Sequence, residues 1–142
     1  MMRIGWKEWV ALPDLGIRRI KAKADTGART SCLHAFRLEP FDREGQRWLR
    51  IWVHPKQRSS REHVCEAPIL ESRVVTNSGG QREERYVILT RLAMGDESWP
   101  IELTLTNRDT MKFRMLLGRS AMKERIVVDP TRAYLTKVSP CA

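Results

Sequence analysis

The sequence predicts an all-β fold, a sandwich or barrel with one short helix near the C-terminus. Two segments alternate apolar and polar residues with the period of a strand, Arg47–Val53 and Trp99–Thr106. Further strand-like runs follow one another at roughly 8–12-residue intervals with turn residues between them, which is typical of sandwiches and barrels. Only Ser120–Arg125 has the character of a helical turn.

The strands can be placed in chain order from their apolar patterning and the turn residues that bound them. We predict strands at Lys7–Leu12, Ile17–Ala24, Ser31–Phe41, Arg47–Val53, Val64–Val75, Glu84–Met94, Trp99–Thr106, Phe113–Arg119, Ile126–Pro130 and Ala133–Val138. Pro13 ends the first strand, and Gly95 opens a tight turn. In the run Arg47–Val53, Leu49 and Ile51 share the apolar face, so we expect that face to be buried.

Length and composition indicate one cytoplasmic domain, covering residues 1–142. A chain of 142 residues buries enough surface to fold without covalent staples. No apolar run approaches the ~20 residues of a membrane span, and Lys7 and Glu8 interrupt any signal-peptide core. Three widely spaced cysteines form no disulfide framework and suit a reducing compartment. Cys32 lies in a strand-like run, where we expect a buried, apolar role.

The net charge of +9 indicates an anionic partner or substrate: nucleic acid, anionic lipid or acidic peptide. The charge is spread along the chain, so a solvated basic surface without a dedicated partner is the alternative. No helix-turn-helix, RNP-like or zinc-finger spacing occurs. Trp48 and Trp52 on an alternating strand are more often core or interface residues than stacking platforms for bases. Nucleic-acid binding is therefore the less favoured interpretation.

Two short motifs carry the chemistry. The triplet Asp25-Thr26-Gly27 directly follows the predicted strand Ile17–Ala24, where it is either an ordinary turn or a catalytic carboxylate loop. Much later in the chain, the segment Leu116–Arg119 (LLGR) follows a strand and precedes the short helix. Between the two motifs lies a predicted hairpin with the glycine-rich tip Asn77–Gln81.

This order resembles the retropepsin-like aspartic peptidases, whose fold is a closed or partly open β-barrel. The segments Leu12–Ala35, Leu105–Met122 and Val127–Leu135 are similar to one bacterial family in particular, known as ATP-dependent zinc proteases. That family is associated with RimK-type ATP-grasp ligases, which add glutamates to proteins. The likeness covers nearly the whole chain and predicts a single retropepsin-like domain.

The resemblance implies roles for named residues. Asp25 would be the catalytic carboxylate, Thr26 would bond across a dimer axis, and Gly27 would let the backbone approach the carboxylates. The remaining implied roles are substrate binding by Ala28, Arg29, Ser78, Gly79 and Gly80, and bracing of the catalytic loop by Leu117, Gly118 and Arg119. The alternatives are a strand-ending turn at Asp25, an exposed hairpin without a lid role and a simple bulge glycine at Gly118.

Two features depart from the retropepsin pattern. Arg29 stands where those peptidases carry an acidic or small polar residue that can pair with the later arginine. Arg29 and Arg119 would repel, so we expect Arg119 to bind another anion, Asp109 or Asp129. Arg29 either faces the cleft, where a guanidinium suits an acidic substrate, or forms a structural ion pair. The hairpin tip is also more polar than a usual flap.

The zinc and ATP of the family name find little support in the residues. A hydrolytic zinc site needs three protein ligands, and no H-E-x-x-H motif occurs; the nearest set is His54, His63 and Cys65, otherwise a polar loop and a strand cysteine. No phosphate-binding glycine motif occurs either. We therefore predict no metal and no cofactor in this chain, and assign any ATP dependence to a partner.

The chemistry of peptide hydrolysis then predicts a homodimer. Two carboxyls about 3 Å apart share one proton, which provides a base and an acid together. One chain has a single D-T-G triplet, so a symmetric dimer must place Asp25 of each protomer at the axis. We predict a homodimeric aspartic endopeptidase acting on acidic, glutamate-rich or glutamylated peptide or protein. The alternative is a non-catalytic module that binds acidic peptide or regulates an ATP-grasp glutamate ligase.

Overall fold

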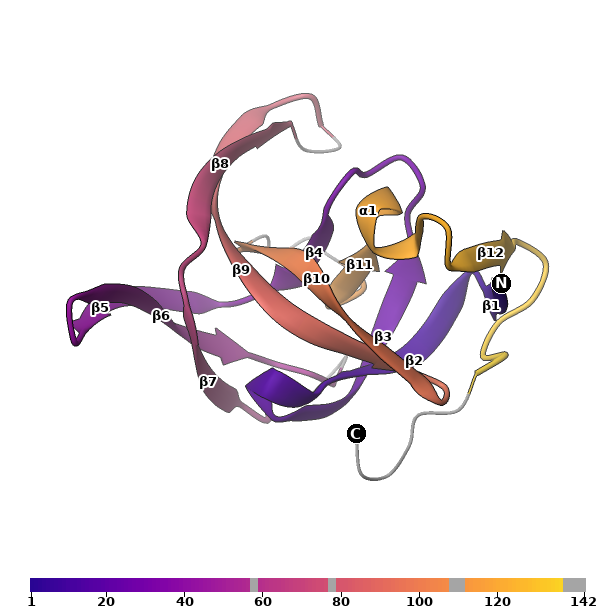
Figure 1. The fold of residues 1–142 in the computed structure, drawn as a ribbon, viewed down its shortest axis with the longest axis horizontal. Coiled ribbons are helices and arrows are strands. Elements are labelled where there is room, and N and C mark those ends of the chain that lie inside the picture. Colours follow the sequence, from indigo (N-terminus) through magenta and orange to yellow (C-terminus); the bar gives the residue numbers. More distant parts are fainter. Residues whose placement is uncertain (57–58, 77–78, 108–111, 137–142) are drawn as a thin grey trace.

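The computed structural model describes residues 1–56, 59–76, 79–107 and 112–136 and confirms the all-β fold with one short α-helix near the C-terminus (Figure 1). Its strands are β1 (Met2–Gly5), β2 (Lys7–Leu12), β3 (Ile17–Ala24), β4 (Ser31–His34), β5 (Arg37–Arg43), β6 (Gln46–Val53), β7 (His63–Pro68), β8 (Glu71–Thr76), β9 (Arg82–Met94), β10 (Glu97–Thr106), β11 (Met115–Leu117) and β12 (Ile126–Asp129). Its helices are the 3₁₀ turn η1 (Pro13–Leu15) and α1 (Arg119–Met122). No helix among the described residues is both long and apolar enough to cross a membrane.

The largest sheet forms a partly open barrel. Its strand order is β10-β4-β11-β3-β2-β9-β8, and β9 also pairs with β10, so the pairings return to the first strand. The strand pairing is shortest between β2 and β9, where the ladder contains the single pair Ala11↔Ala93. The core inside includes the fully buried Ile20, Leu33 and Leu103. Burial of these apolar side chains is the main driving force for closing the barrel.

A second sheet of three strands, β5-β6-β7, extends from the barrel as an arm (Figure 1). The predicted alternation in β6 is confirmed: Leu49 and Ile51 are fully buried, whereas Trp48 and Trp52 on the other face are half-buried. The alternation expected in β10 holds less well, because Thr104 is also buried. Its hydroxyl donates to the Ser31 carbonyl and accepts from Arg85 of β9 instead of facing solvent.

The single strand predicted at Val64–Val75 is wrong, because the chain changes sheets in its middle. β7 ends at Pro68, and β8 begins at Glu71 in the barrel sheet. The Ile69 amide donates to the carbonyl of Arg47 in the arm, and the next amide, that of Leu70, donates to Val87 in the barrel. Pro68 lacks an N–H, so it cannot donate to a continuing ladder.

The predicted strand Ser31–Phe41 is divided in the same way, into β4 of the barrel and β5 of the arm. The segment predicted as a strand at Ala133–Val138 is not one over residues 133–136; residues 137–138 lie outside the described part. β1 was not predicted at all. It pairs in parallel with β12, from Met2↔Ile126 to Gly5↔Asp129, so its partner comes from the opposite end of the sequence.

A buried carboxylate fastens the C-terminal segment to the barrel. Glu8 is 0% exposed, and its two carboxylate oxygens accept hydrogen bonds from the amides of Gly5, Leu135 and Thr136 and from the Thr136 hydroxyl, at 2.7–3.0 Å. A carboxylate at this depth is tolerated because its oxygens are satisfied by donors. Glu8 therefore holds the segment after β12 against the start of β2.

Candidate functional site

The D-T-G loop begins where β3 ends and is held in place by its own backbone. The Asp25 amide donates to the Leu117 carbonyl at 2.8 Å, and the Asp25 carbonyl accepts from the Ala28 amide at 3.1 Å. The Gly27 amide points at the side chain, donating to Asp25 Oδ1 at 3.1 Å. The carboxylate is thus fixed at the top of the loop and is half-buried.

The segment Leu117–Arg119 packs directly beneath this loop. The Arg119 amide donates to the Ala28 carbonyl at 2.8 Å, and the Gly118 amide donates to the Ser31 hydroxyl at 3.0 Å. A Cβ at position 118 would lie 2.5 Å from the Thr30 carbonyl carbon, so only glycine fits without backbone movement. The two motifs meet because β11 lies parallel beside β3, with Leu117 opposite Ala24.

Arg119 binds a main-chain carbonyl oxygen instead of the anion expected for it. Arg119 Nη1 donates to the carbonyl of Thr26 at 3.0 Å. Asp129 accepts from Thr131 and pairs with Arg132, and these contacts lower its pKa, the Thr131 hydroxyl hydrogen bond most of all. The other expected partner, Asp109, lies outside the described residues. A carbonyl oxygen serves a guanidinium well, and sequence alone gives no signal for such a backbone partner.

A cavity of about 520 Å³ opens between the D-T-G loop and the β8–β9 hairpin, which arches over that side of the barrel (Figure 1). Asp25, Gly27, Ala28 and Arg29 line it. The remaining predicted substrate residues divide: Gly79 and Gly80 are exposed and do not line the cavity, and Ser78 lies outside the described residues. Thus the hairpin's strands, not its described tip, face the carboxylate loop.

The cavity lining is strongly cationic. Its positively charged residues are Lys23, Arg29, Arg73, Arg85, Lys112 and Arg119, against the single carboxylate of Asp25. Arg29 is exposed, and within the described chain no hydrogen bond or ion pair holds its side chain. The geometry therefore favours the cleft-facing interpretation of Arg29 over the structural ion pair.

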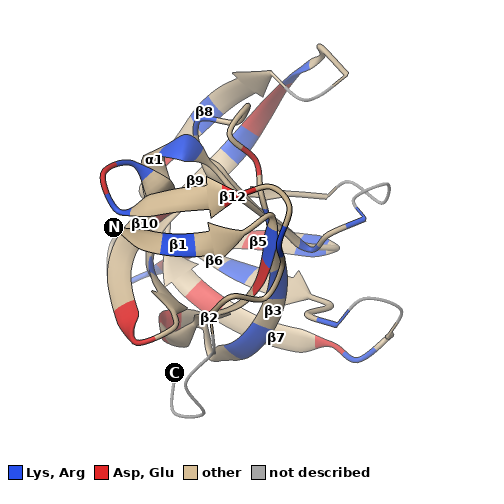
Figure 2. Cartoon of the chain, turned by 90° about the vertical axis from the view of Figure 1, so that its right-hand side faces the viewer, with Lys and Arg blue, Asp and Glu red and all other residues tan. Residues whose placement is uncertain are grey.

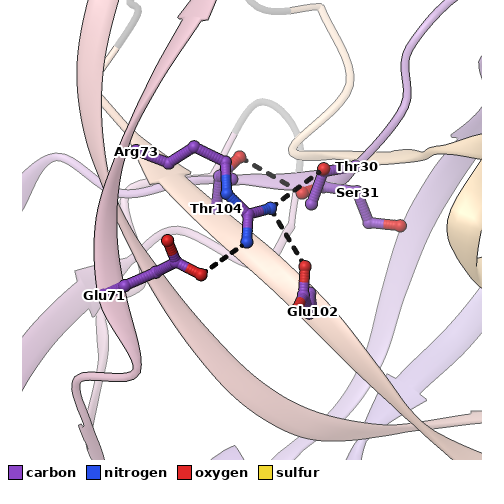
Figure 3. A network of polar contacts seen from close by, with 6 residues as sticks. All are labelled: Thr30, Ser31, Glu71, Arg73, Glu102 and Thr104. Carbon is purple, nitrogen blue, oxygen red and sulfur yellow. Dashed lines mark hydrogen bonds and ion pairs between the residues drawn. The ribbon is translucent and has the colours of Figure 1, made fainter.

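Two arginines lie at the base of the hairpin; Arg85 is one of two arginines, with Arg82, that the sequence suggests as anion contacts of the hairpin, whereas Arg73 was not selected. Arg73 on β8 binds Glu71 at 2.7 Å and Glu102 at 3.0 Å and reaches toward Thr30 (Figure 3). The hydrogen bond to Glu102 is the largest cause of its raised pKa. This network ties the hairpin to β10 and to the end of the D-T-G loop. The available signal was Glu71 and Arg73 at strand spacing, which places both on one face.

Arg85 on β9 is paired with Arg73 directly across the two strands and is 8% exposed. Its Nη1 contacts Cys32 Sγ at 3.5 Å and Thr104 Oγ1 at 3.4 Å, and its Nη2 pairs with Glu83 at 3.2 Å. Cys32, 5% exposed, is buried as expected but also lines the cavity. The cavity floor is therefore polar where it meets the hairpin.

The candidate zinc ligands are not gathered into a site. His63 Nε2 lies 2.7 Å from the Leu15 carbonyl, His54 stacks on Phe36, and the Cys65 thiol donates to the Ile51 carbonyl. Burial is the main reason that the pKa of Cys65 is raised to about 12, which disfavours the thiolate that zinc binds. Among the described residues, no three His, Cys, Asp or Glu side chains are grouped to hold a metal ion. This donor set does not fit zinc.

Comparisons with known proteins agree with the fold. The crystal structure of a Legionella pneumophila protein of unknown function (DUF785) is 28% identical, with a TM-score of 0.78 over 95% of this chain and 98% of that one. A "Probable alpha-L-glutamate ligase" from Parasynechococcus marenigrum is 54% identical over 132 residues, 92% of this chain. One of the same name from Shewanella pealeana is 46% identical over 92% of this chain. The chain spans only 28–29% of the length of these two relatives.

The family comparison covers the whole described site. The RimB-like family, described as "Retropepsin-like aspartic endopeptidase RimB", matches residues 3–139. That range includes the D-T-G loop, the hairpin over the cavity and the segment that braces the loop. The chain belongs to the RimB-like family of retropepsin-like aspartic endopeptidases.

Proposed function

We propose that this protein is an aspartic endopeptidase, active as a homodimer, that cleaves acidic peptide or protein. One observation carries the proposal: a braced D-T-G loop presents Asp25 to a cavity whose other charged lining residues are all cations. The family match and the retropepsin-like fold support the peptidase chemistry. The cationic lining supports the acidic substrate.

The mechanism requires two carboxyl groups. With Asp25 of each protomer about 3 Å from the other, the pair holds one proton, since both cannot remain ionised at that distance. The ionised carboxylate takes a proton from a water molecule, which attacks the scissile carbonyl carbon. The protonated carboxyl donates its proton to the carbonyl oxygen and, as the tetrahedral intermediate collapses, a carboxyl proton passes to the leaving amine.

The chain's own residues would set the geometry of that step. The Gly27 amide holds Asp25 Oδ1, and the brace from Leu117–Arg119 keeps the loop from moving when substrate enters. Such positioning is a large part of enzymatic rate enhancement. Thr26, exposed at the top of the loop, is free to meet its counterpart across the dimer axis, where our proposal places the partner loop.

Acidic substrates follow from electrostatics. Arg29 and Lys23 are exposed at the cavity and face no acidic partner other than Asp25 among its lining residues. Opposite charge attracts substrate to the cleft and raises the association rate. Relatives named as probable glutamate ligases contain a region similar to this chain, so we propose a glutamate-bearing protein as substrate, an ATP-grasp glutamate ligase as a partner and the cytoplasm as the location.

The test compares Asp25→Asn with Asp96→Asn, an equal change at an exposed turn away from the cavity. Cleavage of a glutamate-rich peptide is measured from pH 4 to 8, with the mass of each variant determined by light scattering. We expect a dimer in both cases, turnover in the Asp96 variant and a loss of at least about a thousandfold in the Asp25 variant. Undiminished turnover in a dimeric Asp25→Asn protein would rule out the carboxylate pair.

The second candidate is a non-catalytic module that binds acidic peptide and regulates the ligase. One observation favours it: Arg73 and Arg85 are positioned by ion pairs that do not involve Asp25, so the arrangement of these cations does not depend on that residue. This candidate predicts binding of a glutamate peptide that survives Asp25→Asn and no turnover at any pH.

A further inference from the structure

The outer face of β2 and β3 bears a second group of cations, beyond the catalytic cavity. β3 carries Lys and Arg and no Asp or Glu (Figure 2). Its inward residues, Ile20 and Ala22, are fully buried, so Arg19, Lys21 and Lys23 project from the other side. Adjacent residues on such a row are roughly 7 Å apart.

This face is continuous with the cavity floor. In the sheet register Lys7 pairs with Lys23, Lys23 with Leu116, and Leu116 with Cys32. Residues paired directly across strands project from the same face. Lys23, Leu116 and Cys32 line the cavity, so Lys7 is the next side chain in that row, just beyond its edge.

Aromatic rings support the cations there. Arg19 lies over the Trp9 ring at 4.0 Å and Lys21 at 5.2 Å; Lys7 lies 4.6 Å from the ring centroid of Trp6. Tyr134 stacks against Trp9, with ring centroids 6.0 Å apart. We call Lys7, Arg19, Lys21 and Lys23, with these rings, the β2–β3 track. Cation–π contacts hold the cations without neutralising their charge.

The ion pairing of the track differs from that of the arm. On the arm, Arg37, Arg43, Arg47 and Arg50 each have a carboxylate partner. In the described residues, no salt bridge joins Lys7, Arg19 or Lys23 to an acid; Glu8 next to Lys7 is turned into the core. Lys7, Arg19 and Lys23 therefore offer charge that no carboxylate of the described residues neutralises.

We propose that the β2–β3 track is an extended binding site for the part of an acidic, glutamate-rich chain that lies outside the catalytic cavity. The inference rests on the proposed function for its substrate class. From Lys23 to Arg19 the strand covers roughly 13 Å, the span of about four extended residues. An extended glutamate chain places alternate carboxylates roughly 7 Å apart on one side, matching the cation spacing. The track of a second copy is not the occupant, because like charges would face one another.

Binding to labelled glutamate peptides of about three and about twelve residues tests the track, measured by fluorescence anisotropy at two salt concentrations. All variants carry Asp25→Asn, so that cleavage does not interfere. We expect Lys7→Gln/Arg19→Gln to weaken binding of the long peptide roughly fivefold to tenfold, and binding of the short peptide much less. The matched control, Arg37→Gln/Arg47→Gln, removes the same charge from the arm and should not discriminate between lengths.

The outcomes separate this proposal from the peptidase proposal. An equal effect of the track substitutions on both peptides, or an equal effect of the arm control on the long one, overturns the track. A single-stranded oligonucleotide of equal charge is the second ligand; if the track substitutions weaken it more than the long peptide, the acidic-peptide assignment is wrong. Because binding is measured without turnover, failure of Asp25 to catalyse leaves this result standing.

Discussion

The guanidinium of Arg119 donates to the main-chain carbonyl of Thr26 across 3.0 Å, while the amide of the same residue donates to the carbonyl of Ala28. One residue thus holds the D-T-G loop at two points on either side of Gly27. The contact uses a backbone acceptor, so it does not depend on the side chain at position 29. This explains how an arginine is accommodated where the resembling peptidases carry an acidic or small polar residue.

Replacing Arg119 should therefore damage activity more than stability. Arg119→Met removes the contact to Thr26 but keeps the hydrogen bond from the backbone amide of residue 119 to the Ala28 carbonyl. Because the side chain is exposed, we expect a stability loss below about 1 kcal/mol. Small displacements of a catalytic group can cost about a hundredfold, so kcat should fall between about tenfold and a hundredfold. Arg119→Lys should recover part of it. Wild-type turnover in Arg119→Met would contradict the bracing role.

Gly118→Ala should disturb the loop through its backbone. The added Cβ would lie 2.5 Å from the Thr30 carbonyl carbon and 2.8 Å from the Ser31 nitrogen. Overpacking of this kind typically costs about 1–3 kcal/mol, which urea unfolding measures. Gly45→Ala is the control: nothing lies within 4 Å, and its penalty comes from a φ of +79. Only the change at 118 should also weaken peptide binding; a harmless alanine there would show that the loop can shift.

Glu8→Gln should loosen the C-terminal segment. The amide would present donor hydrogens to amides that now donate to Glu8, leaving buried donors unpaired. We expect a stability loss of about 3 kcal/mol and faster proteolysis near Leu135. Glu97→Gln, at an exposed position, makes the same chemical change without these partners. Equal melting temperatures for the two variants would show that the hydrogen bonds to Glu8 contribute little to stability.

The Cys65 thiol should be inert at neutral pH. Burial raises its pKa to about 12, and the neighbouring Glu66 carboxylate adds to the shift. Because the folded pKa lies above the unfolded value of 9.0, the thiol's contribution to stability is present below pH 9 and is lost as the pH rises toward 12. Iodoacetamide should label the folded protein slowly at pH 8 and the urea-unfolded protein rapidly. Rapid labelling of Cys65 itself in the folded protein at pH 8, identified by peptide mapping, would contradict this.

Much of the fold could be predicted because local patterns were sufficient. The bounds predicted for Lys7–Leu12 and Ile17–Ala24 coincide with β2 and β3, since Pro13 and Gly16 mark the turn between them. The failures share a cause. At Ile69 the chain leaves one sheet for another while remaining extended, and a run of apolar residues contains no signal for which neighbour it will pair with.

The site residues that belong to short contiguous motifs could be predicted from the sequence, whereas those that depend on partners distant in the sequence could not. Asp25 and Gly118 were selected because their motifs are contiguous in sequence. Arg73 was missed because its role depends on Glu102, and the contact of Arg85 with Cys32 gave no sequence signal, since only the packing of β8 and β9 over the barrel brings these residues near. The two-carboxylate arrangement remains a prediction, since it involves a second chain.

The hydrogen bonds from the C-terminal segment to Glu8 affect how the protein folds during its synthesis. The donors at Leu135 and Thr136 emerge from the ribosome long after the glutamate that they satisfy, separated from it by 127 and 128 residues. Until then, burying Glu8 would leave most of its carboxylate unsolvated, which opposes premature docking of the first strands. We therefore expect the barrel of the nascent chain to remain incompletely packed around β2 until this segment has been translated. Its completion would come late in a folding reaction dominated by long-range contacts.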